Sequence, residues 1–511
     1  MAKQYSEMSK AELSQLNSEL QKQYDEIVES GISLDLSRGK PSKEQLDLSE
    51  ELFTALNSSS QCISSTGFDV RNYGLLQGVE EARQLFGQLL GVPAENILVG
   101  GNSSLTMQYD AFARCMLFGV GEHRMSWMKQ GDAKILCPAP GYDRHFAICE
   151  EFRTPMIPVR LTGHGPDMDQ VEELVANDPT IKGLYCVPKY SNPTGETYDE
   201  KTVRRIAELK PAAKDFRVFW DNAYLYHDFG KVTKVANIFD YTNGTENEDM
   251  VYEFFSTSKI TFPGSGVAVM ASSKANIDFA IKHMSVQSIN ADKVNQMRQV
   301  LYLKSPENVR EHMKKHAAIL KPKFELVEQK FHEAFDGTGI ATWTEPDGGY
   351  FISLDIFPNT AKTTFNLCKA AGLKITGAGA TFPYKKDPDS KNLRICPSYA
   401  SAEDLAKDPK YRESFDIVTS RAVSNLRTLS EYCLPFVSVK GSFISYKSGK
   451  IDEEITESRN AVQTLGGAIN RIERFILPLS DYERSLVIID KTDNTPERFP
   501  RKAGTPLKKP L

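Results

Sequence analysis

The sequence predicts an α/β protein built around one large, mostly parallel sheet. From residue 97 onward, short and almost continuous apolar runs alternate with longer helical patterns. Continuous runs are typical of strands buried on both faces, and the helices between them indicate βαβ units. The last two runs are too close together for a helical crossover, so one of them is expected to run antiparallel. The runs are ILVGG (97–101), KILCPAP (134–140), GLYCVP (183–188), FRVFWDNAY (216–224), VYEFFS (251–256) and GVAVMAS (266–272).

Further along the chain, the patterns predict a smaller α+β domain and then a separate C-terminal part. A long helical region at 274–336 precedes strand-like segments at 348–356, 372–379 and 392–399. After about residue 402 a new set of strands begins. We therefore divide the chain into an N-terminal helix and arm that join the small domain (1–50), a large domain (51–300), the small domain (301–401) and a C-terminal fragment with a basic, Pro-rich tail (402–511).

Composition excludes several classes of protein. The 511 residues are 40% hydrophobic and 25% charged, as in an ordinary soluble globular protein, and the net charge of -5 does not favour nucleic acid or an anionic membrane. The N-terminus lacks the apolar core of a signal peptide, and no apolar stretch is long enough to span a bilayer. The eight cysteines form no C-x-x-C pair, which suits a reducing cytoplasm.

A metal site is not expected. His312 and His316 have the i, i+4 spacing of two ligands on one helix face. They stand among Glu311, Lys314 and Lys315, so a solvated helix face is the favoured interpretation.

Polar or glycine-rich turns follow several of the predicted strands. GGNSS (100–104) precedes a helix and suits a phosphate, although such turns are also common helix caps. Tyr142 follows the second run, and SNPTG (191–195), which contains Asn192, follows the third. The alternative for Tyr142 is a ring that only packs, and the alternative for SNPTG is an ordinary Asn-Pro turn.

Two further strand ends carry charge. Asp221 closes a strongly apolar run, with Tyr224 three residues later, and a carboxylate there is costly unless a cation meets it. Lys259 follows the run that ends in Ser256, although lysines are mostly exposed surface residues. In open α/β sheets, ligands bind beyond the carboxyl ends of the strands. One edge of the sheet would therefore hold a phosphate cradle, an aromatic ring, an amide, a carboxylate and a lysine. Together these groups describe a pyridoxal phosphate (PLP) pocket.

Residues 5–400 resemble the fold-type I PLP-dependent aminotransferases, most closely the bacterial aspartate-aminotransferase-like subgroup. The similarity rests on LSRGKPSKEQLDLS (36–49), NYGLLQGVEEAR (72–83) and GAGATFPYKKDP (377–388). It implies a large, mostly parallel seven-stranded sheet with a smaller α+β domain, a cytoplasmic homodimer and PLP as cofactor. It also implies ping-pong transamination between an amino acid and a 2-oxo acid, with aspartate and 2-oxoglutarate favoured.

The resemblance also implies residue roles. Lys259 would bind the cofactor aldehyde and then move the substrate proton, while Asp221 would keep the ring nitrogen protonated. Asn192 and Tyr224 would hydrogen-bond the phenolic oxygen of the ring, and Tyr142 would stack on its face. The phosphate would be held by Asn102, Ser103, Ser104, Ser256, Ser258 and, from the partner subunit, Tyr73. The substrate would be bound by Gly39, Asn192 and Arg394. KITFPGSG (259–266) lacks the arginine that many family members pair with the phosphate.

Residues 402–511 resemble the C-terminal part of 16S ribosomal-RNA methyltransferase G, a guanine-N7 methyltransferase, through SRAV, CLPF and RFPRKAGTPLKKPL. This implies a partial Rossmann-like fragment. The Gly-rich turn that would bind S-adenosylmethionine is absent, so we expect an inactive remnant. Its unpaired strand edge is expected to be covered by the aminotransferase part or poorly ordered.

The C-terminal residues of the chain are basic. Residues 491–511 carry six basic and two acidic residues, a net charge of +4, which allows weak RNA contact. A solvated, mobile terminus is the favoured interpretation. An RNA-binding or RNA-modifying protein and a regulatory scaffold with a PLP fold remain the alternative functions, and the complete set of cofactor residues favours the aminotransferase.

Overall fold

The computed structural model describes residues 4–31, 33–121, 125–399, 412–421, 424–449, 451–476, 483–501 and 505–511. It divides into two compact units, one of residues 1–19 and 35–399 and one of residues 20–34 and 400–511. Helix α1 (Lys10–Glu29) has residues in both. Within the described ranges, no helix is both long and apolar enough to cross a membrane.

The first unit contains a seven-stranded sheet of order β2-β8-β7-β6-β5-β3-β4. All neighbouring pairs are parallel except those of β8, which runs antiparallel to both β2 and β7. The predicted mostly parallel sheet and its antiparallel exception are therefore confirmed. The strands are β2 (Ile97–Val99), β3 (Lys134–Ala139), β4 (Met156–Arg160), β5 (Ile181–Cys186), β6 (Arg217–Asp221), β7 (Val251–Ser256) and β8 (Ala268–Ala271).

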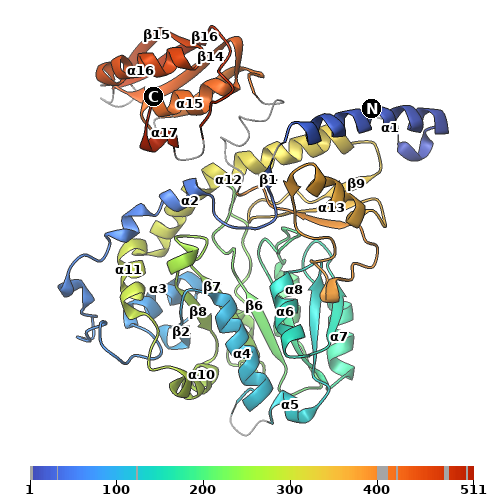
Figure 1. Cartoon of the computed structure of the whole chain (residues 1–511). Coiled ribbons are helices and arrows are strands. Elements are labelled where there is room, and N and C mark those ends of the chain that lie inside the picture. The colour runs from blue at the N-terminus through green and yellow to red at the C-terminus, as the bar shows by residue number, and fades with distance from the viewer. Residues whose placement is uncertain are drawn as a thin grey trace. The chain divides into compact units, whose positions relative to one another are not determined.

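Helices cover both faces of this sheet (Figure 1). In β6, Val218 and Trp220 pack into one apolar cluster and Phe219 into the other. This alternation is why the strand reads as a continuous apolar run. The helices of the large sheet are α3 (Glu80–Leu90), α4 (Ser104–Phe118), α5 (Trp127–Gln130), α6 (Asp143–Glu151), α7 (Met168–Asn177), α8 (Glu200–Ala207), α9 (Phe239–Thr242), α10 (Lys274–Gln287) and α11 (Lys293–Leu303).

A smaller antiparallel sheet of order β12-β10-β9 has its own apolar cluster. The long helix α12 (Pro306–Phe335) joins the two regions, because Val309 and Met313 pack against the large sheet whereas Leu320 and Phe324 pack with the small one. The remaining elements are β9 (Ala341–Trp343), β10 (Ile352–Ile356), β12 (Asn392–Ile395), α13 (Ala361–Ala370), α2 (Lys43–Asp47), and β1 (Leu34–Asp35) with β11 (Leu373–Lys374).

The second unit contains a four-stranded sheet of order β13-β14-β16-β15. Strands β13 and β14 are parallel, and the other two pairs are antiparallel. Its apolar cluster includes residues of α15 and α16. The elements are β13 (Phe415–Arg421), α15 (Leu426–Cys433), β14 (Val437–Ser448), α16 (Asp452–Thr464), β15 (Gly467–Ile476), β16 (Glu483–Lys491) and α17 (Thr505–Lys508).

The C-terminal segment is not the mobile terminus that the sequence suggested. Phe499 is buried in the cluster of the second unit. Arg501 donates from Nε and Nη2 to the fully buried carboxylate of Glu431 at 2.8 and 2.6 Å. That expectation is therefore wrong for these residues, while residues 502–504 of the basic tail lie outside the described ranges.

His312 and His316 are not on a solvated face, so that expectation is also wrong. Both side chains are buried, and His312 Nε2 lies 2.8 Å from the Ile260 carbonyl oxygen and 3.1 Å from His316 Nε2. His316 Nδ1 lies 3.1 Å from Gln45 Nε2. Desolvation lowers the pKa of both histidines, that of His316 to about 3. The pair therefore joins α12 to the turn that carries Lys259.

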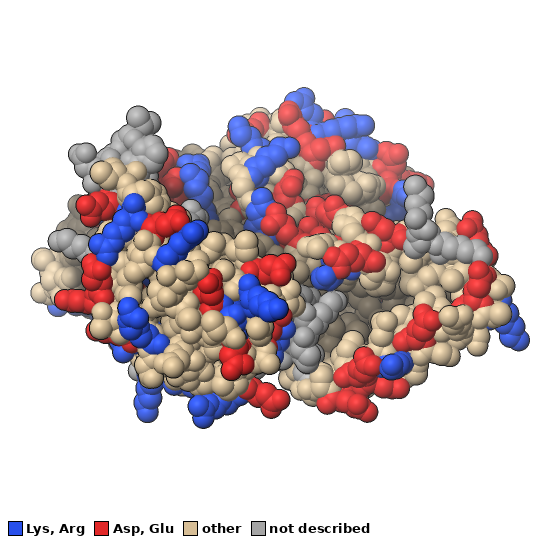
Figure 2. Space-filling model, turned by 90° about the horizontal axis from the view of Figure 1, so that it is seen from above, with Lys and Arg blue, Asp and Glu red and all other residues tan. Residues whose placement is uncertain are grey.

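Charges of both signs are interspersed over the face drawn in Figure 2. That face has no broad patch of a single sign, in keeping with the small net charge of -5.

Candidate active site

Side chains from five strand ends line one cavity at the carboxyl edge of the large sheet. About 360 Å³ of space, counting the part open to solvent, is not filled by atoms there. Because β2, β3, β5, β6 and β7 all run in the same direction, the segments that follow them meet at this edge. The cavity is lined by Ser104, Leu105, Gln108, Tyr142, Val187, Asn192, Asp221, Ala223, Tyr224 and Lys259.

Asp221 has one engaged and one unpartnered carboxylate oxygen. Its Oδ2 lies 2.9 Å from His145 Nε2, whereas its Oδ1 is buried with no hydrogen-bond partner among the described residues. The His145 ring stacks on Tyr185 with centroids 4.4 Å apart. A buried carboxylate oxygen without a donor is costly, so the site fits a ligand that brings a protonated nitrogen to Asp221.

Lys259 lies in the turn after β7 and faces Tyr224. Its Nζ is 4.8 Å from the centroid of the Tyr224 ring. Desolvation lowers the pKa of the Lys259 amine, and the nearby Asp221 carboxylate opposes this shift. Burial raises the pKa of Tyr142 to about 12 and that of Tyr224 well above its ordinary value, so both phenols stay protonated at neutral pH. Burial thus favours the neutral form of the Lys259 amine and the protonated form of both phenols.

Hydroxyl and amide groups gather beside the amino end of α4. Ser258 Oγ donates to the Asn102 carbonyl at 3.0 Å and lies 3.2 Å from Ser256 Oγ. Ser103 is the N-cap residue of α4, and Ser104 is its first residue. A helix N-terminus surrounded by hydroxyl groups is suited to a phosphate. The predicted phosphate residues of this chain, Tyr73 apart, are thus brought together.

Arg394 reaches this edge from β12 of the small sheet. Its Nη1 donates to Asn192 Oδ1 at 3.1 Å and to Asp143 Oδ1 at 3.2 Å, and its Nε donates to Thr376 Oγ1 at 3.1 Å. The guanidinium lies 4.9 Å from the Phe351 ring centroid. These contacts hold the planar group beside Asn192, where a carboxylate could meet its fork.

Gly39 packs against the same phenylalanine. A Cβ added at Gly39 would lie 2.4 Å from the Phe351 ring, so no larger residue fits without a shift. The arm is held nearby, since Ser398 Oγ donates to the Lys40 carbonyl and Thr376 Oγ1 to the Ser37 carbonyl. The backbone of the arm is thereby brought close to the Arg394 strand.

Neither Tyr73 nor Lys189 is among the residues that line this cavity. The Tyr73 side chain is 74% exposed. Lys189, in the segment between β5 and Asn192, is buried and forms a 2.8 Å ion pair with Asp228.

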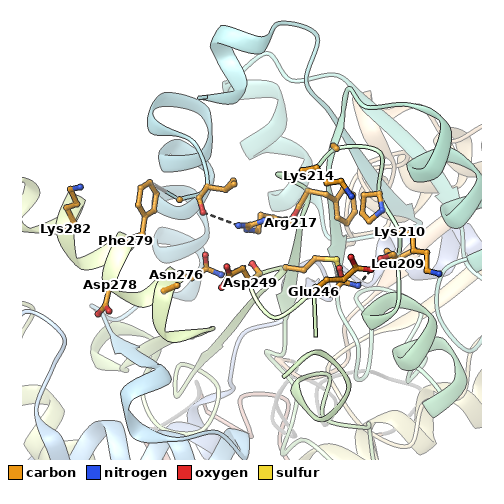
Figure 3. Close-up of a pocket in the computed structure, with 18 residues that line it drawn as sticks. Leu209, Lys210, Lys214, Arg217, Glu246, Asp249, Asn276, Asp278, Phe279 and Lys282 are labelled. Carbon is orange, nitrogen blue, oxygen red and sulfur yellow. Dashed lines mark hydrogen bonds between the residues drawn. The ribbon is translucent and has the colours of Figure 1, made fainter. Parts of the chain in front are cut away.

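A larger cavity lies at the opposite edge of the sheet, where β6 and β7 begin (Figure 3). Arg217, the first residue of β6, is drawn between α10, with Asp278 and Lys282, and the segment that carries Lys210 and Lys214. Arg217 and Asp221 are the two ends of one strand, roughly 13 Å apart at the usual rise per residue. Side chains of both signs line this cavity, and it is separate from the candidate site.

The fold, and the sheet edge at which the lysine, carboxylate and amide meet, place the chain among the fold-type I aminotransferases. A family model described as aspartate aminotransferase matches residues 8–411. An aspartate aminotransferase of Corynebacterium glutamicum is 43% identical over 388 residues, which are 76% of this chain and 89% of the relative. The chain therefore belongs to the aspartate aminotransferase family.

Solved structures of aspartate aminotransferases have the same fold as the first unit. An aspartate transaminase from Corynebacterium glutamicum superposes with a TM-score of 0.75 and 42% identity, covering 78% of this chain and 94% of that one. The aspartate aminotransferase of Thermus thermophilus, with a TM-score of 0.56 and 16% identity over 76% of this chain and 94% of its own, shows the fold alone.

The C-terminal part matches a second family. A model described as rRNA small subunit methyltransferase G matches residues 385–484. The ribosomal RNA small subunit methyltransferase G of Clostridium novyi is 50% identical over 113 residues, 22% of this chain and 46% of the relative. This chain thus spans about half the length of the methyltransferases that it matches.

His145 and Phe351 were not identified from the sequence as site residues. His145 follows Tyr142 by three residues at the predicted edge, so its place beside Asp221 had a sequence signal. Phe351 comes from the small sheet, and nothing in the sequence indicates that it packs under Arg394.

Proposed function

We propose that this chain is a PLP-dependent transaminase that moves an amino group between aspartate and 2-oxoglutarate by a ping-pong mechanism through Lys259. The observation that supports this best is the buried, unpartnered Asp221 Oδ1 in a cavity that also holds the Lys259 amine. Desolvation, which dominates over the neighbouring carboxylate, lowers the pKa of that amine and favours a neutral nucleophile and base.

The cofactor would lie between the described groups and act as the electron sink for the substrate carbanion. Asp221 would hold the proton on its ring nitrogen, and His145 would orient the Asp221 carboxylate. Tyr142 would cover one face, and Asn192 and Tyr224 would bond the phenolic oxygen. Asn102, Ser103, Ser104, Ser256 and Ser258 would bind the phosphate, without an arginine from the segment after Lys259.

The substrate α-carboxylate would bind to Arg394, with help from Asn192 and the backbone at Gly39. The Lys259 amine would accept and return the proton at the substrate α-carbon. Tyr73, exposed in one chain, would complete the phosphate site of the partner subunit, so we also propose a homodimer.

A turnover assay tests this proposal. The protein loaded with PLP is expected to convert aspartate and 2-oxoglutarate faster than other pairs in an amino-acid panel. Lys259→Ala is expected to abolish turnover, while the exposed-lysine control Lys201→Ala keeps it. Full activity of the Lys259 variant would refute the assignment.

We propose no methyltransferase activity for the tail, because the matched segment is about half of its relatives. Firm binding of radiolabelled S-adenosylmethionine to the full chain would contradict this.

A further inference from the structure

One hydrogen-bond partner of Arg394 is itself a carboxylate. Arg394 lies on β12 with its side chain 8% exposed, and its Nη1 donates to Asp143 Oδ1 at 3.2 Å. Asp143 is the first residue of α6, where a helix N-terminus favours a negative charge. Among the described residues, Asp143 is the only acidic side chain that forms an ion pair with Arg394. The guanidinium that is proposed to bind the substrate therefore already has a counter-ion.

The other contacts of Arg394 decide which N–H groups a substrate can use. Its Nε donates to Thr376 Oγ1 and its Nη1 also donates to Asn192 Oδ1, both at 3.1 Å. Nη2 has no hydrogen-bond partner within the part of the chain that the structure describes. A carboxylate that binds bidentately needs two parallel N–H groups of the fork. It can therefore use Nη2 only together with a nitrogen that already has a partner.

The three partners of Arg394 differ in how they respond to a second carboxylate. Thr376 and Asn192 are neutral, so they do not repel an arriving anion. Asp143 is an acid that already shares this guanidinium, and like charges that share one site disfavour each other. A single guanidinium charge is thus divided between two carboxylates whenever a ligand occupies the fork. Asp143 therefore opposes the binding of a carboxylate on either side of Nη2.

We propose that Asp143 is a built-in competitor for the carboxylate-binding fork of Arg394, which the α-carboxylate of the substrate must displace. This inference rests on the proposed function, because it takes Arg394 as the residue that binds that carboxylate. When no substrate is bound, Asp143 keeps the largely buried guanidinium paired with a charge. When a substrate is bound, Asp143 weakens the affinity for amino acid and 2-oxo acid alike, since both carry an α-carboxylate.

Calorimetric titration of the PLP-loaded protein with succinate tests this proposal. Succinate is a dicarboxylate without an amino or oxo group, so its binding is measured in the absence of turnover. Asp143→Asn removes the charge but keeps a side-chain oxygen that can accept from Arg394 Nη1. The dissociation constant for succinate is therefore expected to fall about three- to tenfold, a modest change because solvent screens a carboxylate that is 33% exposed.

Two further variants show that the change belongs to this fork. Asp169→Asn is the matched control, because it removes one carboxylate from an ion pair with Arg205, and neither of these residues lines the cavity. Its dissociation constant for succinate is expected to equal that of the wild type. Arg394→Ala is expected to abolish succinate binding, as it removes the fork itself.

The direction of the change separates competition from a purely structural role. Loss of a residue that only positions Arg394 would weaken binding, so an unchanged or raised dissociation constant in Asp143→Asn, or no binding to either protein, would overturn the proposal. An equal fall in Asp169→Asn, or binding that survives Arg394→Ala, would also overturn it.

The turnover assay keeps this proposal distinct from the transaminase assignment. Wild-type turnover with no gain of affinity in Asp143→Asn would refute the role of Asp143 alone. Tighter binding of succinate by Asp143→Asn, in a protein whose wild type has no turnover, would refute the transaminase assignment alone.

Discussion

Acid is expected to destabilise the aminotransferase unit through its buried histidines. His316 is buried against His312 and Gln45, and desolvation lowers its pKa from 6.5 to about 3. The folded form therefore keeps this ring neutral between pH 3 and 6.5, whereas the unfolded chain protonates it. Stability from this group is complete above pH 6.5 and is lost as the pH falls toward 3.

The magnitude follows from the shift. At 1.36 kcal/mol per pKa unit, lowering the pH from 7 to 5 should reduce the free energy of unfolding by about 2 kcal/mol through His316 alone. His227 adds to this, because its burial and the nearby Lys259 also lower its pKa well below the ordinary value. The three tryptophans, Trp127, Trp220 and Trp343, all lie in the aminotransferase unit, so their fluorescence reports its unfolding without the tail.

The assay is urea unfolding at pH 5, 6 and 7, followed by tryptophan fluorescence. His316→Gln is expected to lower stability at pH 7 but to reduce the difference between pH 7 and pH 5 by about 2 kcal/mol. His164→Gln, at an exposed histidine, is the control and should leave the pH dependence of the wild type nearly unchanged. An unchanged pH dependence in the His316 variant would refute the reasoning.

Three further predictions concern the site and the tail. Arg394→Lys keeps the charge but loses the planar fork, so KM for the amino acid should rise roughly tenfold to a hundredfold in steady-state kinetics; an unchanged KM would exclude Arg394 as the carboxylate ligand. Gly39→Ala places a Cβ 2.4 Å from the Phe351 ring and should lower the free energy of unfolding by about 1–3 kcal/mol in the same urea assay. An unchanged free energy of unfolding would contradict this packing. Arg501→Ala leaves the buried Glu431 carboxylate without its cation and should destabilise the tail by about 3–5 kcal/mol. The expected result is faster proteolysis of residues 412–511, with transaminase activity retained. Equally fast proteolysis of an Arg498→Ala control would contradict this prediction.

The large sheet could be predicted because its strands are buried on both faces and therefore form continuous apolar runs. Strand β4 was missed because it mixes buried, half-buried and exposed positions and includes Pro158, so it forms no continuous apolar run. The short β9 was missed in the small sheet, since three partly exposed residues give little signal.

The candidate site could be predicted from the residues that follow parallel strands, because strand direction alone brings them to one edge. Contacts from other parts of the fold could not. His312 and His316 stand among charged neighbours in sequence, yet the face they share is buried by Gln45, Ser49 and the Ile260 carbonyl. Those partners are far away in the sequence, so local pattern favoured a solvated face.

The visible absorption spectrum of the purified protein during titration with PLP tests the central assignment most directly. The wild type is expected to gain a visible band from cofactor bound covalently to Lys259, and aspartate should deplete that band as the amino group is transferred. Lys259→Ala should show neither change. A wild type that gains no such band, or a Lys259→Ala variant with the same spectrum, would contradict the role given to this lysine.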